Sequence, residues 1–326
     1  MTRATLIYNP VAGRNPVRRQ AEIRAAAEAL RRARFDLQVQ PTTGPGTAQE
    51  IARSEVAAGA KTIFVCGGDG TINEVMNGLA LGHCPLAILP GGTANIAARD
   101  LGLSLEPVAA AAELAQAKVQ RIALGRVIWG EQPTLAAGKG MAARKSESSS
   151  DSPSHARYFL SVAGIGFDAY VVHHLGWNLK REFGVTAYVW KTLQQVWRYG
   201  FPPFVCESGD GEWRGGMALV QRTERYAGWL HLSPGSSLLN SEMKLFLFQS
   251  SSPWRYFVYS TAVALRRHLR LPDLRILQNW PLHCRAETMV KPIRVELDGE
   301  EAGSLPGTFD IVTDALTLLL PERLVR

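Results

Sequence analysis

The sequence predicts an α/β protein whose N-terminal half is a doubly wound parallel sheet and whose C-terminal half is a mainly β, sandwich-like domain. Two observations predict this class. Strand-like and helix-like segments alternate over about the first 125 residues, which is typical of βαβ units. Beyond Val119 the segments become short, β-rich runs separated by turns. The 326 residues, 46% of them hydrophobic, can form two cores, so two domains are expected.

Strands are expected in the first half where short apolar runs lie between turn-like segments. They lie at 4–8, 36–39, 61–66 and 86–89. Helices are expected between and after them, at 16–34, 47–58, 71–80 and 107–117. In the first helix Ile23, Ala26 and Leu30 recur at the spacing of one helix face. Pro107 suits the first turn of the last helix.

The second half contains strand-like runs at 119–129, 158–163, 217–221 and 243–249. We therefore place the domains at 1–125 and 126–307. The polar stretch 138–156 includes the run Ser148-Ser149-Ser150 and has too few apolar residues to form a core. It is expected to be a flexible loop inserted between two paired strands.

Composition limits the cellular setting and the partners. A formal net charge of +7 is compatible with three kinds of partner: nucleic acid, an anionic membrane face or a polyphosphate substrate. The alternative is that the excess of basic residues only keeps the protein soluble. The four cysteines have no CxxC or zinc-type spacing, so neither a disulfide framework nor a structural zinc site is indicated. The sequence begins without a signal-peptide pattern and contains no apolar run of membrane-span length. A cytoplasmic protein is expected.

A glycine-rich turn follows the third expected strand, at Gly67-Gly68-Asp69-Gly70-Thr71. Glycine permits close approach of a ligand, and a helix N-terminus offers N–H groups and a positive dipole end to an anion. Thr71 and Glu74 have capping-box spacing, so the helix is expected to begin at Thr71. The carboxylate of Asp69 requires Mg²⁺ or water between itself and a polyphosphate. A tight turn capped by Asp69 is the structural alternative.

Two further loops are expected at the same edge of the sheet. Gly91-Gly92-Thr93 follows the fourth expected strand, and Asn9-Pro10-Val11-Ala12-Gly13 follows the first. Two adjacent glycine turns suit one triphosphate. The sequence lacks GxxxxGK[ST] and a well-placed GxGxxG, so the P-loop and the Rossmann dinucleotide site are not supported.

Five motifs resemble, in order and over nearly the whole chain, the motif series of the bacterial diacylglycerol kinase family. They are NPVAG at 9–13, GGDGTINEVMNGL at 67–79, PGGTANIAAR at 90–99, VAGIGFDA at 162–169 and LDGE at 297–300. That family is related to sphingosine and ceramide kinases and, more distantly, to NAD kinases. The resemblance implies an ATP-binding first domain, a lipid site in the β-rich second domain, and a chain end, at about 308–326, that returns to the first domain.

The resemblance also implies residue roles. Glu300 is implied to accept the proton of the lipid hydroxyl, with Asp298 essential beside it or a competitor for that role. Asp69, the third candidate catalytic residue, is expected from its place beside the phosphates to organise Mg²⁺ and water rather than to act as the base. The residues implied to surround ATP are Asn9, Pro10, Val11, Ala12, Gly13, Thr42, Gly67, Gly68, Asp69, Gly70, Thr71, Ile72, Asn73, Glu74, Gly91, Gly92 and Thr93. Thr43 is the alternative to Thr42. An ordinary hairpin turn is the alternative for Asp298-Gly299-Glu300.

The chain departs from the family pattern at three places. Ile96 stands where many relatives have Asp after the Asn of the second glycine loop. Asn240 is a neutral residue in the stretch that holds a structural Mg²⁺ in relatives, and it is the candidate metal ligand here. The segment 225–229 replaces a glycine-rich stretch and is expected to reshape the lipid pocket.

The expected reaction is ATP-dependent phosphorylation of a lipid hydroxyl, with diacylglycerol converted to phosphatidic acid. The alternatives are a kinase of the same fold acting on a sphingoid base, another lipid or NAD, and a non-catalytic nucleotide- or lipid-binding protein. Aromatic and basic residues in 173–201 and the cluster Arg266-Arg267-His268-Leu269-Arg270 suggest peripheral contact with the inner membrane face. Buried aromatics and a solvated basic face are the alternative. No nucleic-acid partner is expected, and a homodimer is left open.

Overall fold

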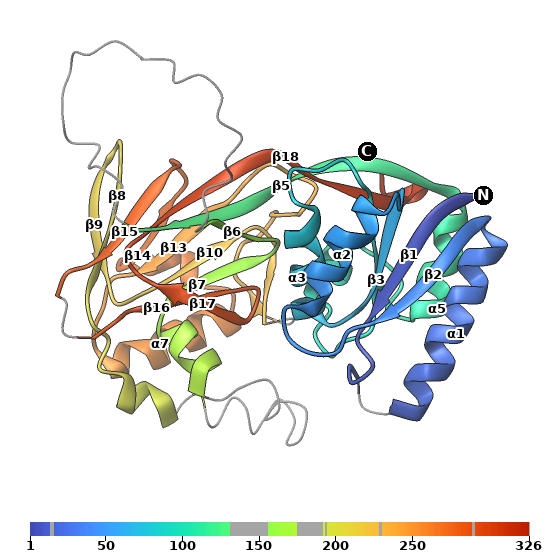
Figure 1. Cartoon of the computed structure of the whole chain (residues 1–326). Helices are drawn as coiled ribbons and strands as arrows, with labels where there is room; N and C mark the ends of the chain where they lie inside the picture. The colour runs from blue at the N-terminus through green and yellow to red at the C-terminus, as the bar shows by residue number, and fades with distance from the viewer. Residues whose placement is uncertain are drawn as a thin grey trace, which may run out of the picture.

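The computed structural model describes residues 1–13, 16–130, 156–174, 192, 194–227, 230–288 and 291–325. Figure 1 shows two halves side by side, an N-terminal half in which helices flank a sheet and a C-terminal half built largely of strands. The predicted fold class is confirmed by this arrangement.

The N-terminal half is a parallel sheet, in the order β2-β1-β3-β4, with helices on both faces. Its strands are β1 (Thr2–Tyr8), β2 (Phe35–Pro41), β3 (Thr62–Gly67) and β4 (Leu86–Pro90). Its helices are α1 (Pro16–Arg32), α2 (Thr47–Ala57), α3 (Asp69–Leu79), α4 (Ile96–Asp100), α5 (Pro107–Glu113) and the short η1 (Leu114–Gln116). Consecutive side chains of a strand alternate between faces, so Phe64 packs with Leu30 of α1 while Val65 packs with Val75 of α3. Burial on both faces explains why β3 is apolar throughout.

The last long strand, β18 (Gly307–Pro321), lies beside β4, with Leu318 paired in parallel to Leu86. It also pairs antiparallel with β5 (Ala117–Trp129) along most of its length. The chain end thus lies against the first half. One 10-stranded sheet therefore continues from β2 into the second half. Because β5 and β18 run through both halves, the domain boundary at 125/126 stays a prediction.

The C-terminal half places a six-stranded antiparallel sheet, in the order β14-β13-β10-β7-β16-β17, against the far end of the large sheet. The core between them includes Phe159, Phe204, Leu245 and Phe309. The remaining elements are β6 (Ala156–Phe159), β7 (Val162–Gly166), β8 (Phe204–Ser208), β9 (Gly211–Gly215), β10 (Met217–Gln221), β11 (Arg225–Tyr226), β12 (Leu230–His231), β13 (Lys244–Phe248), α7 (Pro253–Ala264), η2 (His268–Arg270), β14 (Leu274–Leu277), β15 (Leu282–Ala286), β16 (Arg294–Leu297), β17 (Glu300–Ser304) and η3 (Glu322–Leu324).

The prediction of one strand over 158–163 is wrong, because this stretch is divided into β6 and β7 by a break at Leu160 and Ser161. The backbone N–H groups of these two residues donate to the carboxylate of Asp298 instead of to a neighbouring strand. A side chain distant in the sequence therefore ends the strand, and no local pattern reveals it.

The capping box predicted at Thr71 and Glu74 is also wrong. Helix α3 begins at Asp69, its N-cap is Gly68, and no side chain among the described residues caps it. The carboxylate of Glu74 instead accepts hydrogen bonds from the N–H groups of Gly46 (2.8 Å) and Ala48 (3.0 Å), and so caps the start of α2. In the part of the chain that the structure describes, the first N–H groups of α3 therefore have no side-chain partner, as an anion site requires.

Two predicted features lie outside the described residues. They are the flexible insertion at 138–156, of which only Ala156 is described, and most of the aromatic and basic stretch 173–201. Within the described part of the chain, no helix has the length and apolar character needed to cross a membrane. All four cysteines lie in the described residues as free thiols.

Candidate active site

Three loops meet at the carboxyl ends of β1, β3 and β4, which are neighbours in the sheet. The N–H of Gly91 donates to the carbonyl of Gly67 (2.9 Å), which ties the two glycine turns together. A Cβ on Gly92 would collide with the Cα of Gly68, so the turns approach more closely than any larger residue allows. Gly13, with φ +83°, brings the first loop against the carbonyl of Gly91. The three loops line one edge, as the sequence predicts.

The loops are also joined by side chains. The amide of Asn9 donates to the hydroxyl of Thr71 (3.3 Å), and its carbonyl oxygen accepts from the N–H of Val11 (3.0 Å). Thr42 lies just beyond β2, where its N–H donates to the carbonyl of Tyr8 (2.8 Å) and its side chain is buried, whereas Thr43 is exposed. Of the two candidate threonines, Thr42 is therefore the one held against the end of β1, and Thr43 points to solvent.

Asp69 stands at the first position of α3, between the two glycine turns. Its Oδ1 accepts a hydrogen bond from the N–H of Ile96 (2.8 Å), at the start of α4. Burial raises the pKa of Asp69 to about 6, and the nearby charge of Asp298 adds to the effect, while hydrogen bonds from 95–97 oppose it. A bound cation would favour the ionised form, so this carboxylate suits the magnesium that accompanies a nucleotide.

Asp298 is buried and fully engaged in hydrogen bonding. Its Oδ2 accepts from the Asn73 amide and the Leu160 N–H, both at 2.7 Å. Its Oδ1 accepts from the N–H groups of Ser161 (2.7 Å) and Val162 (3.0 Å). The residue holds α3, the β6–β7 break and the β16–β17 turn together. Four donors occupy the carboxylate, which leaves little opportunity for it to accept a substrate proton.

Glu300 begins β17 and lies directly over the glycine turn of α3. A Cβ placed on Gly70 would overlap the Glu300 carboxylate. Burial raises the pKa of Glu300, and the charges of Glu74 and Asp298 raise it further, while Arg157 opposes them. Within the described residues no group donates a hydrogen bond to the carboxylate oxygens of Glu300. Of the two candidates, Glu300 is thus the carboxylate with capacity for a proton, and its raised pKa suits a general base.

The structure gives three predicted ATP residues other tasks. Ile72 is buried in the core between the sheet and α3. Asn73 is buried against Asp298, and Glu74 caps α2. Gly67, Gly68, Gly70 and Thr93 lie in or beside the glycine turns as expected.

Sequence reasoning missed Arg19. Its guanidinium is 3% exposed, donates to the carbonyl of Cys66 (2.7 Å), and lies where a Cβ of Gly91 would be. A buried cation beside both glycine turns suits phosphate binding. The signal was available, because Arg19 precedes Ile23 by four residues and so falls on the apolar face of α1.

A second missed feature is a pair of buried carboxyl groups behind the Asp298-Gly299-Glu300 turn. Asp168 and Glu296 are in contact around Gly164, and burial raises the pKa of both. Glu296 accepts a hydrogen bond from the N–H of Gly299 (2.5 Å). The hydrogen bond to Gly299 thus ties the buried Glu296 side chain to the turn that carries Glu300.

The candidate structural metal ligand, Asn240, does not lie in a metal-binding arrangement. Its carbonyl accepts a hydrogen bond from the buried guanidinium of Arg222 (3.3 Å), and burial lowers the pKa of Arg222 to about 10. A cation at this position repels a second one. Over the residues that the structure describes, no three His, Cys, Asp or Glu side chains are grouped for a metal. The residues here do not fit a structural Mg²⁺.

The substitution Gly70→Ala is expected to lower the turnover of any reaction that uses Glu300 by about 10–100-fold, because the new methyl group displaces the carboxylate from the turn. The fold should be retained, because alanine is a better helix former than glycine and the flexible end of the Glu300 side chain can move aside. Gly44→Ala is the matched control, because apart from its chain neighbours no atom of the described residues lies within 4 Å of the point that its new Cβ would occupy. Equal activity in both variants would show that Glu300 works elsewhere.

Comparisons with known proteins agree with this geometry. Residues 3–127 match the family model for the diacylglycerol kinase catalytic domain. A "Diacylglycerol kinase" of Bacillus subtilis is 27% identical over 328 residues, covering 99% of this chain and 97% of the relative. A "Probable lipid kinase YegS-like" of Pseudomonas aeruginosa is 34% identical over 214 residues, covering 65% of this chain and 62% of the relative. A crystal structure of a diacylglycerol kinase from Bacillus anthracis superposes with a TM-score of 0.71 at 21% identity, covering 99% and 98% of the two chains, which bears on the fold.

Proposed function

Because the chain belongs to the diacylglycerol kinase family of lipid kinases, we propose that it transfers the γ-phosphoryl group of ATP to the hydroxyl group of a lipid. The acceptor after which its relatives are named is diacylglycerol, which would yield phosphatidic acid. The observation that carries the proposal is the position of the Glu300 carboxylate over Gly70, inside the paired glycine turns.

In the proposed reaction the lipid hydroxyl oxygen forms a bond to the γ-phosphorus. The bond from that phosphorus to the bridging oxygen breaks, ADP leaves, and the hydroxyl proton passes to Glu300. The glycine turns and the start of α3 hold the phosphates through N–H groups, and Arg19 adds a positive charge beside them. Magnesium is expected to arrive with ATP and to be oriented by Asp69, where it would neutralise developing charge.

Transfer of labelled γ-phosphate from ATP tests the proposal. The acceptors to compare are diacylglycerol, monoacylglycerol, ceramide, sphingosine and NAD, each with and without Mg²⁺. We expect a labelled lipid product that depends on Mg²⁺. Labelling of NAD alone would assign the chain to the other branch of this fold. The absence of any labelled product, with ATP still bound, would indicate a binding protein.

We further propose that the chain docks on the inner face of an anionic membrane through an aromatic patch on and beside α7. The patch comprises exposed apolar side chains at Trp197, Trp254, Val258, Leu265 and Leu269. Trp254, Val258 and Leu265 recur on one face of the helix and its end, and the Trp197 and Trp254 rings are in contact, with centroids 4.8 Å apart.

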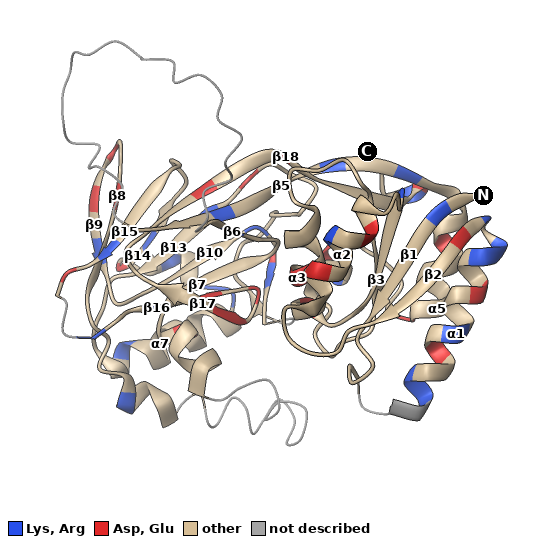
Figure 2. Ribbon diagram, viewed as in Figure 1, with Lys and Arg blue, Asp and Glu red and all other residues tan. Residues whose placement is uncertain are grey.

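Basic side chains surround this aromatic patch. Arg198, Arg266, Arg267 and Arg270 are exposed, and Figure 2 shows basic residues on and next to α7. His268, in contrast, is buried and bonded to the carbonyl of Leu232. Aromatic rings flanked by cations are suited to the interfacial region of anionic lipid bilayers.

Replacing Trp254, which is 70% exposed, by Ala should weaken binding to vesicles of phosphatidylglycerol and phosphatidylcholine about tenfold, because a large apolar side chain no longer enters the interface. Vesicle sedimentation at low and high salt measures this, and wild-type binding should fall as salt rises. Trp213, a half-buried side chain that packs against the β-sandwich core, provides the control variant Trp213→Phe. Unchanged binding of Trp254→Ala would contradict the proposed docking face.

A further inference from the structure

Arg222 directly follows β10, and its side chain is completely buried, at 0% exposure. Its Nη1 donates to the carbonyl of Leu160 (3.0 Å) and its Nη2 to the carbonyl of Asn240 (3.3 Å). Burial lowers the pKa of Arg222 to about 10, and the charges of Asp298 and Asp100 oppose this change. The guanidinium therefore stays charged at neutral pH. Burying a charge is costly unless oxygen atoms and opposite charges surround it, which indicates that this position requires a cation.

One of the two carbonyls leads to the turn that carries Glu300. Leu160 lies in the break between β6 and β7, and its N–H donates to Asp298 (2.7 Å), two residues before Glu300. The backbone N–H of Arg222 also donates to the carbonyl of Ser161 (2.9 Å), the second residue of the break. Asp298 thus binds N–H groups of the break, and Arg222 binds its carbonyl groups. Together they fix the backbone that supports the turn.

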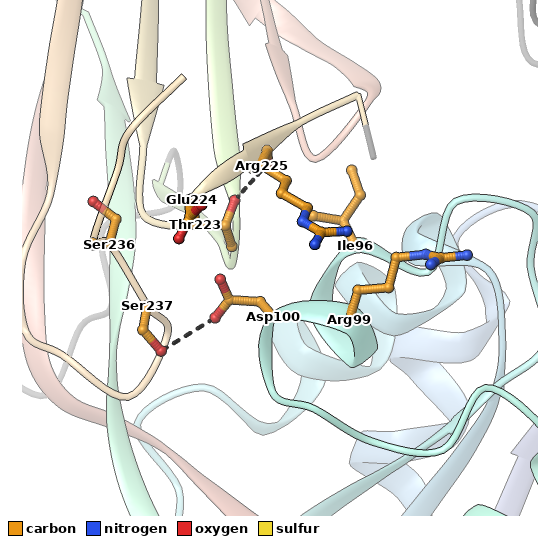
Figure 3. Close-up of a pocket in the computed structure, with 9 residues that line it drawn as sticks. Ile96, Arg99, Asp100, Thr223, Glu224, Arg225, Ser236 and Ser237 are labelled. Atoms are coloured by element: carbon orange, nitrogen blue, oxygen red, sulfur yellow. Dashed lines mark hydrogen bonds between the residues drawn. The ribbon is translucent and has the colours of Figure 1, made fainter. Parts of the chain in front are cut away.

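The other carbonyl leads to the N-terminal half. Asn240 ends a loop that also contains Ser237 and Leu238. The hydroxyl of Ser237 (3.3 Å) and the N–H of Leu238 (2.8 Å) donate to the carboxylate of Asp100, at the end of α4. Figure 3 shows the hydroxyl contact beside a cavity of about 340 Å³ that residues of both halves line. The 237–240 loop is therefore held by Asp100 at one point and by Arg222 at another.

Helix α4 in turn connects to Asp69. The N–H of Ile96, the first residue of α4, donates to the Asp69 carboxylate (2.8 Å), next to the glycine turn under Glu300. A chain of contacts centred on Arg222 therefore joins the two carboxylates that the proposed reaction uses. The atoms around Arg222, main-chain carbonyls with a carboxylate nearby, are of the kind that bind a divalent cation. The chain places a guanidinium there instead.

On the premise of the proposed function, we propose that Arg222 is a positioning residue whose guanidinium does the work of a structural divalent cation. It holds Glu300, on the β-rich half, in the position relative to Asp69 that phosphoryl transfer needs. A metal ion is then required only together with the nucleotide, and the fold itself needs none. A planar guanidinium suits this task, because its several donors reach separate carbonyls at once.

Melting temperatures without nucleotide test the cation role. After treatment with a chelator, the wild type should melt within about 1 °C of the same protein in about 10 mM MgCl₂, because only a bound metal ion would stabilise the fold. Arg222→Met should melt about 10 °C lower, because two buried carbonyls lose their donors and Asp100 loses a nearby positive charge. Arg222→Lys should lose about half as much, because it keeps the charge but not the planar fork.

Steady-state kinetics test the positioning role, with the acceptor that the labelling panel identifies and at a temperature where every variant is folded. Arg222→Met should lower kcat about 10–100-fold and change the KM for ATP less than about threefold, because Glu300 shifts relative to Asp69 while the glycine turns stay in place. Arg222→Lys should recover part of the loss. Leu282→Ala is the matched control, because Leu282 is buried in the core of the β-rich half, and its truncation should lower the melting temperature but not kcat.

Three outcomes would overturn the proposal or its premise. A wild-type melting temperature that rises by several degrees with Mg²⁺, and does so equally in Asp69→Asn, would reveal a structural metal site that Arg222 does not replace. A kcat of Arg222→Met equal to that of Leu282→Ala would limit Arg222 to stability. If the wild type phosphorylates no acceptor, the proposed function fails, and the melting temperatures decide the cation role alone.

Discussion

Glu300→Gln is expected to lower kcat for lipid phosphorylation by about 10²–10⁴-fold while ATP binding is retained. Glutamine has the same shape and can occupy the space over Gly70, but its amide cannot take the hydroxyl proton. The measurement is steady-state transfer of labelled phosphate together with nucleotide binding by calorimetry. Full activity in this variant would exclude Glu300 as the proton acceptor.

The adjacent Glu301 offers a matched control for this substitution. Its carboxylate is bonded to His173 and Arg294 on the surface, and these contacts lower its pKa. Surface ion pairs contribute little to stability, so Glu301→Gln should keep kcat within about twofold of the wild type. A comparable loss in both variants would point to a disturbed β17 rather than to lost chemistry.

Asp298→Asn is expected to destabilise the protein by about 3–5 kcal/mol, because the new amide group faces N–H donors in place of an acceptor. Four donors from Asn73 and from 160–162 converge on this carboxylate. Urea unfolding measures the loss, and activity should fall together with the folded fraction.

Asp314→Asn is the control for the Asp298 substitution. Asp314 is exposed and has φ 51°, a conformation that Asn tolerates well, so its replacement should change stability by less than about 0.5 kcal/mol. If Asp298→Asn kept full stability and lost only activity, Asp298 would have a chemical role that its hydrogen bonds do not suggest.

The parts of the site that could be predicted from sequence are those encoded locally. The strand, glycine turn and helix order at 62–79 and 86–100 follows from apolar runs and glycines, and parallel strands bring such turns to one edge. The return of the chain end to the first domain was implied by the family resemblance, which named neither a strand nor its neighbour in the sheet. It could not come from residue patterns, because pairing between residues as distant as Leu86 and Leu318 leaves no local signal.

The parts that could not be predicted depend on long-range partners. Glu74 has the spacing of a capping residue for its own helix, yet it caps α2, which the fold brings alongside. Asp298 and Glu300 are equivalent in the sequence pattern. They differ because one carboxylate meets four donors and the other meets the backbone of Gly70. Such differences arise from tertiary packing, which overrides local preference.

The central claim, that Glu300 accepts the proton at the glycine turn, is tested most directly by the pH dependence of kcat/KM for lipid phosphorylation. Only the ionised carboxylate can accept a proton, so the rate should fall as the pH falls through the raised pKa of Glu300. We expect this acidic limb above the ordinary carboxyl range in the wild type, and its absence from the residual rate of Glu300→Gln. The same acidic limb in the variant would contradict the claim.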